Sequence, residues 1–426
     1  AATLAAARVG ARVILADEQN EFGGWLLGEV DVTIDGAAPA DWVAGAVAEL
    51  QAMPDVTLLP RTTVFGYMDH NYLTLTERVT DHMADAPAHL PRQRLWKVRA
   101  AHTVLAQGAH ERPLVFSGND LPGVMLAGAV RTYINRYGVV PGNRTVVFTN
   151  NDDAYRTALA LHGAGAHVVV VDLRRDLRGD LIKAVRAAGI NVMSGHAVSI
   201  AAGTQRIARV EIAPVNEDGS ALLDDPIHMD CDLLAMSGGL SPAVHLHSQA
   251  RGKLGWDERL LCFKPTTTHE ASVNAGAGNG VFDIEKAVAD GMKAGAVAAK
   301  AAGFAADAGE PPAVAAPKMS HRPLPAWKIT NGHGPGQGPK AFVDFQNDVT
   351  ASDVQLAARE GYQSVEHVKR YTTLGMATDQ GKTSNINGLA ILADTLGREI
   401  PEVGTTTFRM PYTPAGLGAI AGRDIG

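Results

Sequence analysis

The chain has 426 residues, of which 46% are hydrophobic and 19% charged, so it can build globular cores over about three domains. Its net charge of −7 comes without a concentrated basic stretch, which argues against a nucleic-acid partner, and no apolar run approaches the roughly 20 residues that span a bilayer. The two cysteines, Cys231 and Cys262, form no C-x-x-C pair; this excludes a disulfide framework and predicts a reducing, cytoplasmic setting.

The first elements form half of a nucleotide-binding unit. The stretch "AATLAAARVG" predicts a helix that Gly10 ends, and "ARVILADE" predicts a buried strand with Asp17 and Glu18 at its tip. Helix, strand and terminal acid are the second half of a dinucleotide-binding βαβ unit, whose first strand and Gly-rich loop would lie before residue 1. Because the chain opens without Met and closes without a terminal element, we expect it to be a fragment.

A second unit starts at "NRTVVFTNNDDAYRTALALHGAGAHVVVVDLR", which predicts strand, turn, helix and strand, with Asp172 at the second strand's tip. Its turn carries Asp152 and Asp153 where a dinucleotide site needs glycines, and these acids would repel a pyrophosphate. A unit kept for structure is therefore favoured over a working nucleotide site.

The remaining segments complete a two-domain plan with an added module. "DCDLLAMSGGLSP" and "ASVNAGAGNGVFDIEKAVADGMKAGAVAAKAAG" predict a return into the first domain, and Pro, Ala and Gly mark a linker after it. We predict an α/β chain with these parts: a first dinucleotide-binding domain over 1–140, an inserted second Rossmann-like domain over 141–240, a return to the first over 241–305, a linker over 306–339, a small helical module over 340–400 and an extended tail over 401–426.

Capping signals divide the module into short helices. Thr350 and Asp353 form a capping-box pattern, Ser364 caps the next helix, and Thr383 or Ser384 caps the last, "NINGLAILADTLG".

The stretch "GMATDQGKTSN" ends like a phosphate-binding P-loop. The first glycine of that motif would fall on Met376, and the preceding residues have helical spacing, so an ATPase is not expected. Lys382, Thr383 and Ser384 nevertheless stand at a predicted helix N-terminus, where N–H groups and an ammonium suit a phosphate. An ordinary helix cap beside a solvated lysine is the alternative.

Metal and thiol chemistry are not expected. His245 and His247 in "VHLHSQ" would lie on one face of a strand, but no third ligand stands nearby. "HMDCD", from His228 to Asp232, is interpreted as the polar lead into a strand. A disulfide reductase needs a paired cysteine that the chain lacks.

Longer stretches carry a family resemblance. The run from "VDFQNDVTASDVQLAAREG" to "DQGKTSNINGLAILADTLG", then "VGTTTFRMPYTPAGLGAIAG", resembles the α subunits of heterotetrameric sarcosine oxidases, as do "DLLAMSGGLSPAVHLHSQARGKLGWDE" and "HERPLVFSGNDLPGVML". The large subunit of N-methylglutamate dehydrogenase has a similar pattern. The resemblance implies a two-dinucleotide-binding-domain flavoprotein fold.

The helical module resembles the small [2Fe–2S] modules of related amine and cyanide-forming dehydrogenases. Their C-x-C and C-x-x-x-x-C positions correspond here to Asp344, Gln346, Asp379 and Ser384. None of these is a thiolate, which a cluster requires. The resemblance therefore implies a module that keeps the fold and has lost the cluster.

The resemblance also implies cofactors and partners. In this family a β subunit carries FAD and oxidises sarcosine to glycine, and electrons pass to an FMN at the α/β interface, which reduces oxygen to hydrogen peroxide. The α subunit holds NAD, and a C-terminal folate-binding domain forms methylenetetrahydrofolate. We expect β, γ and δ partners, no catalytic residue in this chain, and the start of the folate domain, truncated, at 401–426.

Site residues follow from that expectation. For NAD, Asp17 is expected to accept hydrogen bonds from a ribose, with Glu18 as the substitute. The expected walls of the site share small size or backbone approach: Gly23, Gly24, Val64, Gln107, Gly108, Gly276 and Asn279. For the FMN phosphate we expect Lys382, Thr383 and Ser384, with Thr405, Thr406, Thr407 and Arg409 as a second group.

Two points stay open. The substrate of the complex is sarcosine, N-methylglutamate or another secondary amine. The rival functions for the chain are a non-catalytic scaffold that binds NAD structurally and an independent NAD(P)H oxidoreductase.

Overall fold

The computed structural model describes residues 1–426 except 217–218, 220, 224, 330–337, 407 and 423–426. Thr407, one of the expected flavin-site residues, therefore lies outside the described part of the chain. Within the described residues, no helix is long and apolar enough to cross a bilayer.

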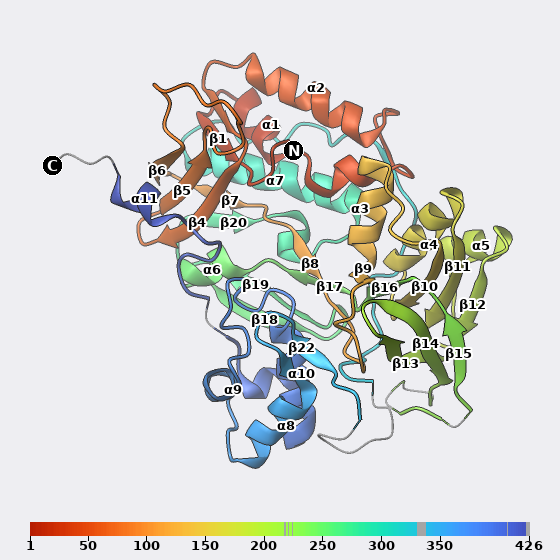
Figure 1. Cartoon of the computed structure of the whole chain (residues 1–426). Coiled ribbons are helices and arrows are strands. Elements are labelled where there is room, and N and C mark those ends of the chain that lie inside the picture. The colour runs from red at the N-terminus through yellow and green to blue at the C-terminus, as the bar shows by residue number, and fades with distance from the viewer. Residues whose placement is uncertain (217–218, 220, 224, 330–337, 407, 423–426) are drawn as a thin grey trace.

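The first unit is built on two closely packed helices, α1 (Ala2–Arg8) and α7 (Ile284–Ala301), which lie side by side in Figure 1. Their contact depends on glycine, because a Cβ at Gly295 would lie 2.2 Å from the Ala2 carbonyl oxygen. The helices contact two parallel strand pairs: β1 (Val13–Ala16) with β3 (Val56–Leu59), and β7 (Thr103–Leu105) with β20 (Ser272–Asn274). The small-residue helix, the acid-tipped strand, the Gly-rich turn and the long Ala-rich helix predicted from sequence are confirmed.

Smaller elements surround this unit. They are the antiparallel sheet β4 (Thr62–Met68), β5 (Tyr72–Arg78) and β6 (Gln93–Arg99); the helices η1 (Gly24–Gly28), α2 (Pro39–Gln51) and η2 (Gly276–Asn279); and the pairs β2 (Thr33–Ile34) with β21 (Val314–Ala315), β8 (Ala109–Glu111) with β17 (Leu240–Pro242), and β18 (Lys253–Asp257) with β19 (Cys262–Thr267).

The second unit is a five-stranded parallel sheet with apolar cores on both faces. Its order is β12 (Asn191–Ser194), β11 (His167–Asp172), β10 (Arg144–Thr149), β16 (Leu233–Ser237) and β9 (Val124–Leu126). Helices α3 (Ala127–Tyr137), α4 (Asp153–Gly163) and α5 (Asp180–Ala187) contribute to one core, and the sheet β13 (His196–Gly203), β14 (Ile207–Pro214) and β15 (Ile227–Asp230) packs on the other.

Two strands of this sheet bear on the predicted domain bounds. β16 lies within the predicted range 141–240 and pairs with β10 there, although its stretch is also interpreted as part of the return into the first domain. β9, within the range 1–140, pairs with β16. Both are short apolar runs, and their pattern alone does not tell which sheet they join.

The polar stretches around these strands also differ from expectation. "HMDCD" starts in a strand of its own, β15, before the chain enters β16. The segment expected to present His245 and His247 on a strand face is the helix α6 (His245–Gln249).

The C-terminal module packs short helices into one core. Its elements are β22 (Phe342–Asp344), β23 (Val349–Thr350), α8 (Ala351–Arg359), α9 (Val365–Thr372), α10 (Asn385–Leu396) and η3 (Ile400–Val403). The helix α11 (Leu417–Ala421), in the tail, has no buried residue and contacts β6 of the first unit. The capping box of Thr350 and Asp353 is present, whereas Ser364 and Ser384 stand at N-cap positions without a side-chain cap bond. The tail is not wholly extended, because η3 and α11 interrupt it.

Both cysteines are free and buried. Burial raises the pKa of Cys231 to about 12 and that of Cys262 to about 11.

Candidate functional site

Hydrogen bonds to backbone groups hold Asp17 at the end of β1. Asp17 N–H donates to the Leu59 carbonyl, and the Asp17 carboxylate accepts a bond of 2.9 Å from Gln19 N–H. Burial raises the pKa of Asp17. Arg78 binds the Glu18 carbonyl at 2.8 Å, which leaves the Glu18 carboxylate out of that contact.

Two expected wall segments lie against each other at the end of β7. Gln107 Nε2 donates to the Ala243 carbonyl at 2.6 Å, and Gly108 O accepts a bond of 2.9 Å from Ala243 N–H. In η2, a Cβ on Gly278 would lie 3.5 Å from Gly108 O. The structure therefore brings Gln107 and Gly108 together with the turn that contains Gly276 and Asn279. This is the carboxyl end of a parallel strand, where ligands of such sheets bind.

Packing explains two of the other expected wall residues, Gly23 and Val64, whereas a Cβ on Gly24, whose φ is +54°, would meet no atom within 4 Å. A Cβ on Gly23, whose φ is +125°, would come within 3.1 Å of Leu27 and Val43 side chains. Val64 joins the apolar cluster that also contains Ala16 at the end of β1. For Gly23 and Val64 the fold itself supplies a reason for the residue type.

A compact group connects this region to the C-terminal module; the sequence points to its Lys382 as a phosphate ligand but does not reveal the roles of its other members. We call it the Tyr412 cluster: His110, His245, Lys382, Phe408 and Tyr412. The His245 and Tyr412 rings stack at 3.2 Å and 12°, and Lys382 Nζ lies 4.2 Å from the Tyr412 ring centroid. The Tyr412 hydroxyl is 3.3 Å from His110 Nε2, and Phe408 meets Tyr412 edge-on at 5.5 Å.

Within the Tyr412 cluster, Lys382 is the charged residue and the other four members are aromatic rings. Burial lowers the pKa of His110 to about 4 and that of His245 to about 2, and the Lys382 ammonium adds to both effects. Burial also lowers the pKa of Lys382, while the nearby Glu18 and Asp379 carboxylates oppose that change. Both imidazoles are therefore neutral near pH 7.

The Lys382 side chain thus reaches from the module toward the strand-tip acid Glu18. Ser384, at the N-cap of α10, is 1% exposed, and its hydroxyl has no hydrogen-bond partner among the described residues. A buried hydroxyl without a partner at a helix N-terminus is a group that fits a phosphate. In the second expected group, Thr406 is buried and Arg409 is exposed, with its N–H bound to Gln380 Oε1 at 3.0 Å.

Polar side chains bridge the loops around Asp344 and Gln346, two of the positions that the family resemblance relates to cluster cysteines. Asp344 accepts bonds from Gln346 N–H and Asn347 N–H, both 3.0 Å, and from Gly375 N–H at 2.7 Å. Gln346 Oε1 accepts from the Thr378 hydroxyl at 3.0 Å. No group of three or more His, Cys, Asp or Glu residues in the described part of the chain could hold a metal ion.

The acidic residues at the strand ends of the second unit bind side chains of the same unit. Asp172 is fully buried and binds the Tyr155 hydroxyl at 2.8 Å and Arg174 at 2.7 Å; Arg174 also binds Asp152 at 2.6 Å. The segment 320–324 crosses the end of β10, where Leu324 exchanges two bonds with Asn150. This arrangement favours the structural interpretation of the unit.

A second group that the sequence did not reveal is a buried charge network between the two units. Arg131 binds Glu29 at 3.2 Å and Asp153 at 3.0 Å, and Arg156 also contacts Glu29. Burial opposes ionisation of Asp153, but Arg131 and Arg156 outweigh it and hold the pKa of Asp153 below its usual value.

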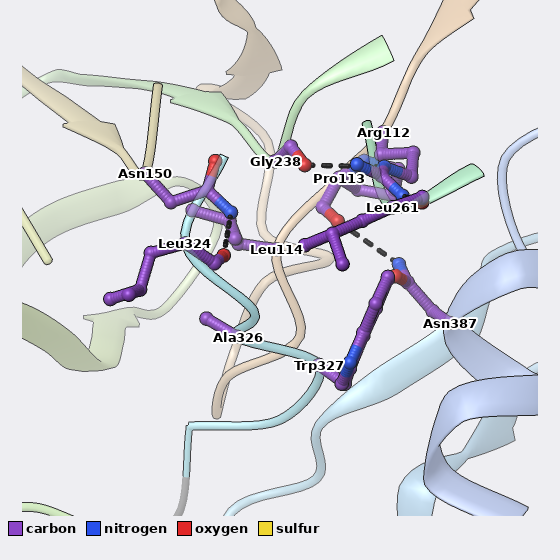
Figure 2. Close-up of a pocket in the computed structure, with 10 residues that line it drawn as sticks. All are labelled: Arg112, Pro113, Leu114, Asn150, Gly238, Leu261, Leu324, Ala326, Trp327 and Asn387. Atoms are coloured by element: carbon purple, nitrogen blue, oxygen red, sulfur yellow. Dashed lines mark hydrogen bonds between the residues drawn. The ribbon is translucent and has the colours of Figure 1, made fainter. Parts of the chain in front are cut away.

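Figure 2 shows the junction of the two units with the module, around Arg112. This fully buried guanidinium donates to the carbonyls of Gly238, at 3.2 Å, and Leu261, and lies 5.2 Å from the Trp327 ring centroid. Asn387 of α10 donates to the Pro113 carbonyl at 3.0 Å. The space between these residues has a water-accessible volume of about 0 Å³, so it is a packed joint and not a ligand pocket.

Comparison with known proteins identifies relatives for the whole chain. Residues 338–423 match the model of the Sarcosine oxidase A3 domain. The chain is 44% identical to sarcosine oxidase subunit alpha of Corynebacterium sp. (strain P-1), over 100% of this chain and 44% of that protein. It is 42% identical to the subunit of the same name from Rhizobium meliloti (strain 1021), over 100% of this chain and 41% of that protein. The chain thus spans less than half the length of these relatives.

Among solved structures, L-proline dehydrogenase from P. horikoshii has a TM-score of 0.69 at 19% identity, covering 98% of this chain and 76% of that one. At this identity the likeness shows the fold alone, and it extends the α/β assignment through the C-terminal module.

Proposed function

Because this chain is related over its whole length to sarcosine oxidase α subunits, we propose that it is the part of such a subunit that binds NAD and one side of an FMN site. The complex would demethylate sarcosine oxidatively to glycine, with hydrogen peroxide and methylenetetrahydrofolate as further products. The partners would be the β, γ and δ subunits, with FAD in β, folate in a domain outside this chain, and a cytoplasmic location.

One observation carries the proposal for this chain: the Tyr412 cluster joins His110, which follows the Gln107–Gly108 turn, to Lys382 in the loop that leads into α10. Asp17 would accept hydrogen bonds from a ribose of NAD, and the Gln107–Gly108 turn would let its backbone approach the ligand. Lys382, Thr383 and Ser384 would hold the FMN phosphate. When bound, FMN would supply electron transfer to oxygen; this chain contributes no residue that oxidises the amine.

The C-terminal module would be a [2Fe–2S]-type module without its cluster. Asp344 and Gln346 support this, since they join by hydrogen bonds the same loops that thiolates and iron would join.

The test uses the full-length chain co-expressed with its neighbouring subunits. The absorption spectrum is recorded before and after anaerobic addition of sarcosine, and bound cofactors are identified. We expect flavin bleaching and the presence of both FMN and NAD. Bound NAD without FMN would contradict the flavin site and leave Ser384 as an N-cap residue with no role in cofactor binding.

The same measurement separates the other candidates. Bleaching by N-methylglutamate and not by sarcosine would support a related secondary-amine dehydrogenase. NAD without any turnover would support a scaffold, and oxidation of NADH by the chain alone would support an independent oxidoreductase.

A further inference from the structure

We infer that Tyr412 is a positioning residue for Lys382: its ring, held by His245, fixes the place of the Lys382 ammonium beside the loop that leads into α10. The inference rests on the proposed role of Lys382 as a ligand of the FMN phosphate, and it adds a residue from the tail to that site.

The Tyr412 ring is fixed on several sides. His245 stacks on it at 3.2 Å, so that face is filled and the ammonium, 4.2 Å from the centroid, lies over the other face. The hydroxyl is 3.3 Å from His110 Nε2, and Phe408 packs against the ring edge-on. A ring held in this way presents its negative face to a cation at a defined place.

The backbone of the tail is fixed to the same loop that carries Lys382. Gln380 Nε2 donates to the carbonyls of Arg409, at 3.0 Å, and Pro411, at 2.6 Å, while Tyr412 N–H donates to Phe65 O at 3.3 Å. The tail therefore joins β4 of the first unit to the loop before α10. Tyr412 is the residue of this tail that contacts the ammonium.

Two carboxylates act on the Lys382 ammonium besides the Tyr412 ring. Glu18 and Asp379 both attract the Lys382 ammonium, and lysine is a point charge on a flexible four-carbon stem. Without an aromatic face, the ammonium would turn toward one of these carboxylates and be neutralised there. A phosphate at the N-terminus of α10 would then lose its cationic partner, although Lys382 is still present.

The test is a double-mutant cycle in the full-length complex. The ratio of FMN-loaded to FMN-free complex is measured after protease digestion, so that flavin is counted whether or not it is attached to protein. In the natural background, Tyr412→Leu should lower this ratio about tenfold, and Tyr412→Phe, which keeps the ring, by less than about threefold. In a Lys382→Met background, Tyr412→Leu should change it by less than about twofold.

A matched control is Tyr137→Leu. The Tyr137 ring also has a guanidinium over it, that of Arg136 at 5.3 Å, but it is 59% exposed and lies outside the proposed site. This variant should leave the FMN ratio unchanged. If Tyr412→Leu does not yield a folded complex, His245→Asn removes the stacked imidazole and should give a smaller loss with the same dependence on Lys382.

The outcomes separate the two proposals. Loss of FMN with Lys382→Met but not with any Tyr412 or His245 variant would overturn the positioning role and leave the phosphate site standing. Equal loss from Tyr412→Leu in both backgrounds would show a structural effect and also overturn it. No loss with Lys382→Met would overturn the phosphate site itself, and the positioning role with it.

Discussion

Glu111 is a carboxyl group in a fully buried position, between Gly128 of α3 and the charge network of Arg131 and Asp153. One oxygen accepts a bond of 2.8 Å from Gly128 N–H, and the other has no hydrogen-bond partner among the described residues. Burial raises the pKa of Glu111 to about 7; Asp153 adds to the effect, and Ser237, Gly128 and Arg131 oppose it. Between about pH 4.5 and pH 7, Glu111 therefore stays protonated in the folded chain, whereas it has lost its proton in the unfolded chain.

A pH dependence of stability follows. Below the ordinary glutamate pKa the group is neutral in both states, and as pH rises toward 7 the folded state loses up to about 3 kcal/mol through this group. Glu111→Gln, which stays neutral and keeps an acceptor for Gly128 N–H, should match the natural protein near pH 4.5 and melt at a higher temperature at pH 8. Thermal unfolding at both pH values checks this, and the difference between the two proteins cancels the opposite contributions of His110 and His245. A difference that is constant with pH would show that the pKa of Glu111 is the same in the folded and unfolded chain, which would contradict the raised pKa.

Residues differ in how far the sequence reveals them. Asp17 was found because it follows a run of buried strand residues, and the structure has it at the end of β1. Glu111 and Tyr412 stand in the quoted motifs "HERP" and "FRMPYTP", but nothing near them in the chain signals their role. Their partners come from distant segments, such as His245 for Tyr412, and only the folded chain assembles them.

At the scale of elements, the sequence predicts helix ends more reliably than it predicts which strands pair. The capping box of α8 and the glycine end of α10 involve neighbouring residues, and both are present. The places of β9 and β16 depend on strands far away in the chain, and α6 depends on packing that overrides an extended reading of "VHLHSQ".

The loops of the C-terminal module depend on one acid. Asp344 is 1% exposed and accepts three backbone N–H bonds, so Asp344→Asn should remove charge-assisted bonds worth about 1–3 kcal/mol and loosen the loop before α10. We expect a lower melting temperature and faster proteolysis in 375–384. The control is Asp348→Asn, an exposed neighbour with φ of +53°, a value that asparagine tolerates. Equal effects of the two variants would contradict the role of Asp344.

At the scale of the whole molecule, the two nucleotide-binding-like units differ in what their strand-tip acids do. Asp17 is partly exposed at its strand tip, whereas Asp172 is fully buried and bound to Arg174 and Tyr155. The segment 320–324 also covers the end of β10. The proposed function therefore implies one dinucleotide per chain.

Cofactor counting tests this asymmetry. We expect one NAD per full-length chain in the purified complex. Asp17→Asn should weaken NAD binding about tenfold or more, because the ribose hydroxyls lose a charged acceptor, while the matched variant Asp172→Asn should leave NAD content unchanged in the folded fraction. Two NAD per chain, or the reverse order of effects, would contradict the assignment.

The buried cysteines have a practical consequence. Because both thiols are inaccessible and hold their protons at neutral pH, maleimide or spin-label reagents should leave the folded chain unmodified. A pair of cysteines introduced at exposed sites, such as Leu417 (83% exposed) in the tail and Val30 (70% exposed) in the first unit, would then be the only reactive ones in this chain. Distances between the tail and the first unit can thus be measured by spectroscopy without first removing the native thiols.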